Sequence, residues 1–236
     1  MPKRALIDKR PWLVASLVAG VSYWLASKGQ VPGLWLILWK GAGVALLAAY
    51  AWAHHQSRNA HLLALVMALG AMGDMLLEVF FTAGAAAFLL AHLAAIALYL
   101  RHRREHPTGS QKAAAVATLI GVPLISWQLT SAADVTLYAL SLAGMAAAAW
   151  LSSFPRYRVG TGAMMFVASD LLIFARMGPL AASAMPNLLI WPLYYFGQFL
   201  ICTGVIATLR ARGEFRAGYP ATGSITVPSA SRSSGP

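Results

Sequence analysis

The sequence is poor in charged residues, above all in acidic ones. Only 11% of its 236 residues are charged and only seven are aspartate or glutamate, whereas a soluble domain carries roughly 25% charged residues. Cysteine is nearly absent, and the single Cys202 excludes a disulfide framework and a thiolate metal site. No zinc motif, nucleophile elbow, phosphate-cradling glycine loop or dinucleotide fingerprint is present. These absences exclude an ordinary soluble domain and several familiar catalytic centres.

Apolar residues make up 59% of the chain and recur in runs of about 20 residues, long enough to cross a hydrocarbon core of ~30 Å. In that core the backbone must satisfy its own hydrogen bonds, which long runs do as helices, and the alternating pattern of a membrane barrel is missing. The sequence therefore predicts an all-α, polytopic integral membrane bundle with eight transmembrane helices. The predicted spans are about 11–27, 33–53, 62–81, 84–100, 113–130, 134–152, 161–177 and 187–208. The third and fourth spans, divided only by residues 81–83, should form a tight hairpin.

Lysine and arginine are unevenly distributed between the two sets of connections. One set carries the N-terminal cluster, Arg58, residues 101–112, Arg156, Arg158 and the tail arginines, and the other only Lys28 and Arg176. Because basic residues favour the cytoplasmic side, both termini should be cytoplasmic. The expected organisation is a basic N-terminus over residues 1–10, a transmembrane domain over 11–208 and a disordered cytoplasmic tail over 209–236.

The net charge of +11 does not indicate a nucleic-acid partner. The basic residues sit in short clusters between apolar runs, where they set topology and contact anionic lipid headgroups. Membrane lipids are therefore the expected surroundings, and the alanine- and arginine-rich composition favours a bacterial inner membrane. The oligomeric state is not encoded in any recognisable pattern.

Three of the seven acidic residues lie inside predicted spans: Asp74, Glu78 and Asp170. An ionisable side chain in the middle of a span is costly in lipid, so each is a candidate functional residue. Asp74 and Glu78 are four residues apart and should share one helical face. Two carboxylates so close in a low dielectric do not both ionise readily, and a protonated carboxyl beside an ionised one is what general acid–base catalysis requires. Packing contacts, or a Glu78 side chain reaching the interface, are the structural alternatives.

Other polar residues inside spans are candidates for binding or proton transfer. Lys40 needs a counter-ion inside the membrane, and Asp74 or Asp170 is the expected one. The lysine could instead hold a phosphate, or its side chain could extend to the membrane interface. His92 is a candidate proton carrier or a buried hydrogen-bonding residue. Tyr194, Tyr195 and Gln198 form a polar patch, although tyrosines also occur as interfacial belt residues. We expect no metal, because His54, His55 and His61 have no recognised ligand spacing.

The ordered set of these motifs resembles the YhhN family of membrane proteins, whose characterised members are lysoplasmalogenases. The matching stretches are Gly73-Asp74, Phe88-Leu89-Leu90-Ala91-His92, Gly162–Asp170 and Tyr194-Tyr195-Phe196-Gly197-Gln198, with Lys40 where the family carries a lysine. The resemblance covers roughly residues 12–208. Two positions depart from the family: Gly41 replaces a common proline, and Ala95 replaces a common aromatic.

The resemblance implies hydrolysis of the vinyl-ether bond of a lysoplasmalogen, a lysophospholipid, to a fatty aldehyde and a glycerophospho-alcohol, with no cofactor. In this interpretation Asp74 and Asp170 divide the acid and base roles, and Glu78 modulates them. Lys40 contacts the phosphate or balances charge, Tyr195 and Gln198 orient water or a hydroxyl, and His92 is a secondary proton carrier.

Two other functions fit the same residues. Carboxylates and a lysine in mid-membrane also suit a proton-coupled transporter, although paired repeats and broken helices are not evident. A lipid-binding protein without catalysis is the other alternative.

Overall fold

The computed structural model describes residues 10–27, 29, 33–53 and 57–213. Eight α-helices are present in this part of the chain, and a π-helical turn, η1 (Arg156–Gly160), precedes the seventh. The helices are α1 (Arg10–Ala26), α2 (Gly33–Ala53), α3 (Arg58–Leu76), α4 (Phe81–Arg101), α5 (Gly109–Thr130), α6 (Ala133–Leu151), α7 (Thr161–Met177) and α8 (Met185–Ala211). The described residues form no β-strand, so the predicted all-α class is confirmed.

Within the described residues, seven helical segments are long and apolar enough to cross a membrane: α2 to α6, η1 with α7, and α8. The chain is thus an integral membrane protein. α1 is apolar but has only 17 residues, about 25 Å of helix at 1.5 Å per residue, so the eighth span and the cytoplasmic placement of the termini stay predictions. Residues 1–9 and 214–236, which hold most of the predicted N-terminus and tail, lie outside the described residues.

The predicted turn between the third and fourth spans is wrong by several residues. α3 ends at Leu76 and α4 begins at Phe81, so the hairpin turn is residues 77–80 rather than 81–83. A Cβ added at Gly84 would lie 2.6 Å from the Leu77 backbone nitrogen, so α4 starts directly against the end of α3. Because apolar residues continue through the turn, with Glu78 the only charge in it, hydropathy could not locate it.

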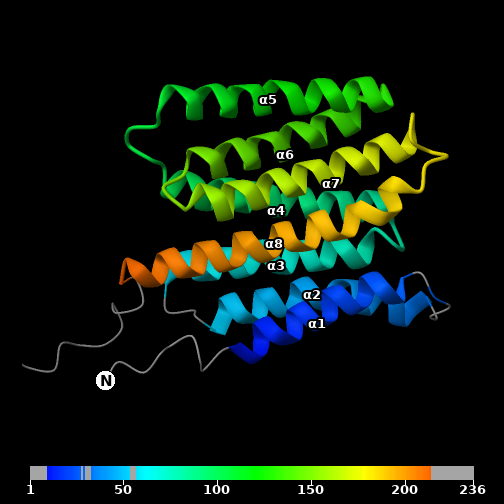
Figure 1. Cartoon of the computed structure of the whole chain (residues 1–236), viewed down its shortest axis with the longest axis horizontal. Helices are drawn as coiled ribbons and strands as arrows, with labels where there is room; N and C mark the ends of the chain where they lie inside the picture. The colour runs from blue at the N-terminus through cyan, green and yellow to red at the C-terminus, as the bar shows by residue number, and fades with distance from the viewer. Residues whose placement is uncertain (1–9, 28, 30–32, 54–56, 214–236) are drawn as a thin grey trace, which may run out of the picture.

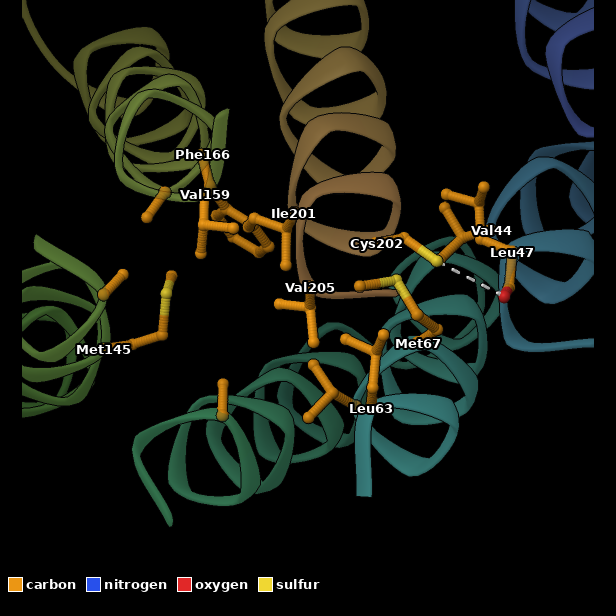
Figure 2. Close-up of a cluster of buried hydrophobic side chains, with 14 of the residues drawn as sticks. Val44, Leu47, Leu63, Met67, Met145, Val159, Phe166, Ile201, Cys202 and Val205 are labelled. Carbon is orange, nitrogen blue, oxygen red and sulfur yellow. Dashed lines mark hydrogen bonds between the residues drawn. The ribbon is translucent and has the colours of Figure 1, made fainter. Parts of the chain in front are cut away.

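Successive helices run in alternating directions, with α1 and α5 at opposite edges and α8 in the interior of the bundle (Figure 1). Ile201, Cys202 and Val205 of α8 are buried among side chains of the surrounding helices (Figure 2). The Cys202 thiol donates to the Leu47 carbonyl of α2 at 3.6 Å. Cys202 therefore packs in the core, and the helices around α8 form one hydrophobic cluster.

The start of α1 and the end of α8 lie toward the same end of the bundle (Figure 1). That end also receives the start of α3 at Arg58, the end of α4 at Arg101 and the start of η1 at Arg156. The opposite end carries the α3–α4 turn, the start of α6 and the connection from α7 to α8. The candidate site lies toward this opposite end, in a cavity framed by six helices.

Candidate active site

A cavity of about 330 Å³ lies among α2, α3, α4, α6, α7 and α8, near the lower end of the range for small-molecule sites. Its polar lining comes from all six of these helices. These residues are Lys40, Asp74, Thr82, Asp134, Tyr138, Ser169, Asp170 and Tyr194. The rest of the lining is apolar or aromatic, as suits a ligand with a hydrocarbon part. The cavity thus joins both predicted aspartates in one space.

Asp74 is 2% exposed, in the last turn of α3. Its Oδ2 accepts a hydrogen bond of 2.7 Å from the Tyr194 hydroxyl of α8. α3 and α8 can approach here because Gly70 has no side chain: a Cβ at that position would lie 3.4 Å from the Tyr194 hydroxyl and 3.2 Å from Gln198 Nε2. A buried carboxyl therefore keeps a fixed orientation toward the cavity, with only one of its oxygens bonded by the tyrosine.

Asp170, 6% exposed on α7, has a matching arrangement. Its Oδ2 accepts a hydrogen bond of 2.8 Å from the Tyr138 hydroxyl of α6. The preceding Ser169 donates to the Ile190 carbonyl of α8 at 3.0 Å, which fixes α7 against α8 beside the cavity. Each aspartate is therefore held by a tyrosine of another helix, an arrangement suited to proton transfer at a defined position.

Lys40 forms its ion pair with Glu78, at 2.5 Å between Nζ and Oε1, rather than with Asp74 or Asp170. Glu78 lies in the α3–α4 turn and is not part of α3, so the predicted shared helical face with Asp74 is wrong. The side chains of Lys40 and Glu78 are 15% and 45% exposed. Lys40 also lines the cavity, while Glu78 does not. The pair therefore places a cation at the cavity wall, with its counter-ion toward the end of the bundle.

The start of α8 is shaped by Pro192, which has no backbone N–H to give to the carbonyl of Leu188. The indole of Trp24 in α1 donates to that carbonyl instead, at 3.1 Å. The Trp191 indole donates to the Gly20 carbonyl at 2.8 Å. Side chains thus satisfy a backbone group that a helix in lipid could not leave unbonded, and α1 fixes the part of α8 that carries Trp191 and Tyr194 into the cavity.

Two predicted polar residues lie behind the cavity. Gln198 follows Tyr194 by one turn of α8, and both side chains approach Gly70 of α3. Gln198 also lines a second, small void of about 10 Å³ together with His92. His92 Nδ1 lies 3.2 Å from the Ser141 hydroxyl, and its ring centroid is 5.4 Å from that of Tyr138. Among the described residues, none is a hydrogen-bond partner of His92 Nε2. Both residues therefore lie beside the tyrosines that hold the aspartates.

Tyr195 points away from the cavity. Its hydroxyl is 2.9 Å from the hydroxyl of Ser16 in α1. The Ser16 hydroxyl in turn donates to the Gly43 carbonyl of α2 at 2.6 Å. Tyr195 is not among the lining residues of the cavity, so the structure places it at a helix contact, apart from the predicted water- or hydroxyl-binding position. Tyr194, its neighbour in sequence, faces the site instead.

Sequence reasoning brought together Lys40, Asp74, Asp170 and Tyr194, which all line the cavity. It missed Tyr138 and Ser169. Tyr138 was discoverable in principle, because it is a polar-tipped residue within an apolar run and lies one turn after Asp134. Ser169 directly precedes Asp170, but no sequence pattern indicates its contact with α8. Within the part of the chain that the structure describes, no three His, Cys, Asp or Glu side chains gather as a metal-binding group.

Comparison with known proteins covers the whole of this site. The sequence matches the YhhN family model over residues 35–205. It is 35% identical to curated proteins named lysoplasmalogenase from Mycobacterium bovis and Mycobacterium tuberculosis, over 70% of this chain and 68% of each relative. No solved structure matches the chain. The matched segment contains every residue named above for the cavity.

Proposed function

The chain belongs to the YhhN family, and from that premise we propose that it hydrolyses the vinyl-ether bond of a lysoplasmalogen or a related ether lysophospholipid. The products are a fatty aldehyde and a glycerophospho-alcohol. Lysoplasmalogenase is the name of both curated relatives. The observation that carries the proposal is the pair of buried aspartates, each bonded by a tyrosine, on one mostly apolar cavity.

The chemistry of the reaction defines what the site must supply. A proton adds to the outer alkene carbon and leaves an oxocarbenium-like cation at the carbon that bears the oxygen. Water adds to that cation and loses a proton, and the resulting hemiacetal collapses to aldehyde and alcohol. The site therefore needs a proton donor, a negative charge near the cation, and an acceptor for the proton of water.

We assign these roles to Asp74 and Asp170, which face the cavity from α3 and α7. One carboxyl donates the proton to carbon, and the other, ionised, stabilises the cation and accepts the proton of the attacking water. The Tyr194 and Tyr138 hydroxyls each engage one carboxylate oxygen and hold the group in place. Because both aspartates are so held, either can take either role, and the kinetics of single variants must assign them.

Lys40 is proposed to bind the substrate phosphate, because among the described residues no other lysine or arginine lines the cavity. Glu78 holds Lys40 before the substrate arrives. We therefore propose that Glu78 fixes the position of Lys40 and partly neutralises its charge. Glu78 would act on the aspartates only through that lysine. Gln198 positions Tyr194, and His92 is proposed to position Tyr138 rather than to carry a proton, since it lies behind the cavity.

We propose that the chemistry takes place within the membrane. If the arginine-rich end is cytoplasmic, as the basic residues favour, the cavity opens in the half of the membrane away from the cytoplasm. A bacterial inner membrane is the proposed location. The substrate is then a single-chain lipid of that membrane, which reaches the aspartates without leaving the bilayer.

The test is aldehyde release from a vinyl-ether lysophospholipid by protein purified in detergent, with Asp74→Asn and Asp170→Asn beside the wild type. We expect release by the wild type and a loss of about a hundredfold or more in each variant, with unchanged thermal unfolding. Glu105→Gln, at an exposed position near the opposite end of the bundle and outside the cavity lining, is the control and should retain activity. Detergent removes compartments, so a transporter would give no product in this assay.

Release by both aspartate variants at the wild-type rate would contradict the assigned roles. A folded wild type that binds the substrate without releasing aldehyde would contradict the hydrolase and favour a carrier or a lipid-binding protein.

A further inference from the structure

The residues that line the cavity differ sharply in exposure. Its polar inner wall is buried: Asp74, Asp170 and Tyr194 are at most 6% exposed. At the starts of α4 and α6, in contrast, Phe81 is 51% exposed and Leu137 is 68% exposed. We call the exposed lining residues, Phe81, Thr82, Ala86, Asp134 and Leu137, the α4–α6 mouth.

The opening follows from how α4 and α6 pack. The two helices contact each other farther along, where His92 meets Ser141 and a Cβ at Gly144 would lie 3.3 Å from Ile96 Cδ1. Nearer their starts, α4 presents small residues to the cavity, among them Ala85 and Ala86. Small side chains there leave the gap between the helices unfilled, so the cavity reaches the surface of the bundle.

The mouth opens sideways, toward lipid, as well as toward the end of the bundle. Ala86 lies five residues into α4 and Leu137 four residues into α6, about 6–8 Å from each helix start at 1.5 Å per residue. Both helices are long and apolar enough to cross a membrane, and nearby Leu90 and Leu140 are also about half exposed. The surface around the mouth is therefore one that hydrocarbon chains cover.

The size of the cavity limits what it can enclose. Its volume of about 330 Å³ is near the lower end of the range for sites that enclose a small molecule. A whole lysophospholipid, with its headgroup and a long hydrocarbon chain, is larger than the ligands that such a site encloses. Because the bond to be cleaved joins the chain to the glycerol, one of these two parts must lie outside when that bond reaches Asp74 and Asp170.

The residues that line the cavity indicate which part of the substrate stays outside it. Lys40 offers a cation to the phosphate at the α2 side of the cavity. The mouth offers the apolar surface of Phe81, Ala86 and Leu137, and its one charged side chain, Asp134, would repel a phosphate. We propose that the substrate enters sideways through the α4–α6 mouth and that its hydrocarbon chain remains in the bilayer during the reaction. Only the vinyl ether and the glycerophosphate then occupy the cavity. This inference rests on the proposed function and adds the path and the limits of the substrate.

A hydrocarbon chain that stays in the bilayer makes no contact inside the cavity. The activity of the enzyme should therefore depend little on the length of that chain. The substrates are vinyl-ether lysophospholipids with dodecenyl to octadecenyl chains, presented in phosphatidylcholine bilayers to the reconstituted protein. We expect kcat/KM of the wild type to vary by less than about threefold across the series. A steep optimum at one length would show an enclosed chain channel and overturn the proposal.

Bulky substitutions in the mouth test the path. Leu137→Trp and Ala86→Trp should lower kcat/KM about tenfold or more for all chains. Leu140→Trp and Leu90→Trp are controls on the same two helices, exposed but not lining the cavity, and should stay within about twofold of the wild type. Equal activity of mouth and control variants would overturn the proposal.

The two hypotheses fail separately. A wild type that releases no aldehyde contradicts the hydrolase, not the mouth. The mouth is then tested by binding of a radiolabelled 1-O-alkyl lysophospholipid, which has no vinyl ether. Binding weakened about tenfold or more in Leu137→Trp, but not in Leu140→Trp, would support the mouth, and equal binding would overturn it.

Discussion

The Tyr138 hydroxyl donates a hydrogen bond of 2.8 Å to Asp170 Oδ2 and so joins α6 to α7 at the cavity. The relationship is repeated between Tyr194 of α8 and Asp74 of α3, at 2.7 Å. A carboxyl buried in a membrane segment has few polar partners available. Each tyrosine supplies one while its ring packs among apolar side chains, and the two aspartates are thereby held in one space.

Removal of the Tyr138 hydroxyl should lower catalysis without unfolding the protein. Tyr138→Phe keeps the ring and deletes one hydrogen bond to a carboxylate, a contact worth about 1.5–3 kcal/mol. We expect kcat to fall by about tenfold to a hundredfold in the aldehyde-release assay, with a lower unfolding temperature but a variant that is still folded at the assay temperature. Tyr157→Phe, at a position 83% exposed, is the control and should have no effect. An unchanged kcat for Tyr138→Phe would mean that Asp170 needs no such support.

Lys40 and Glu78 should affect substrate binding in opposite directions. Lys40→Met removes the proposed phosphate contact, so KM should rise about tenfold with kcat little changed, the pattern of lost uniform binding. Glu78→Gln removes the competitor for Lys40 and should leave KM equal or lower. The measurement is a full kinetic curve for each variant. If Lys40→Met lowers kcat while KM stays constant, Lys40 acts on the reaction and not on binding.

The fold was largely accessible from the sequence because hydropathy determines which segments enter the membrane. The second and seventh predicted spans, 33–53 and 161–177, match α2 and α7 at both ends. The turn after Leu76 was misplaced because apolar residues run through it. That error placed Glu78 on α3, whereas it lies in the turn and pairs with Lys40.

The site was accessible only in part, for a physical reason. Asp74, Asp170 and Lys40 are conspicuous because charge in a membrane span is costly. Which tyrosine faces the cavity depends on helix rotation, and Tyr194 and Tyr195 are adjacent in sequence, so composition could not separate them. In the sequence, Tyr138 looks like any other aromatic residue of an apolar helix. Its role follows only from the packing of α6 against α7, which brings its hydroxyl to Asp170.

The close contact between α7 and α8 should be sensitive to a single methyl group. A Cβ at Gly162 would lie 2.6 Å from the Gly197 carbonyl oxygen, on backbone that cannot rotate away. We expect Gly162→Ala to destabilise the protein by about 1–3 kcal/mol, seen as a lower unfolding temperature in detergent. Gly121→Ala on α5 is the control, because nothing lies within 4 Å of its Cβ position, and it should be neutral or stabilising. Equal unfolding temperatures of the two variants would show that α7 and α8 are less closely packed than described.

Substitutions of His92 can distinguish a positioning role of its ring from a role in proton transfer. Its ring packs 5.4 Å from the centroid of Tyr138 and 5.3 Å from that of Phe166, and it does not line the main cavity. His92→Phe preserves this ring packing and removes both nitrogens, including the contact to Ser141. A residue that positions Tyr138 through its ring can be replaced in this way, so kcat should stay within about threefold of the wild type, whereas loss of a proton carrier costs about a hundredfold or more. His92→Ala, which also removes the ring, should lower kcat and stability together, because Tyr138 then loses its neighbour. The kinetics of the two variants decide between the roles: a hundredfold loss in a folded His92→Phe would restore the proton carrier, and near-normal turnover would leave the chemistry to the two aspartates.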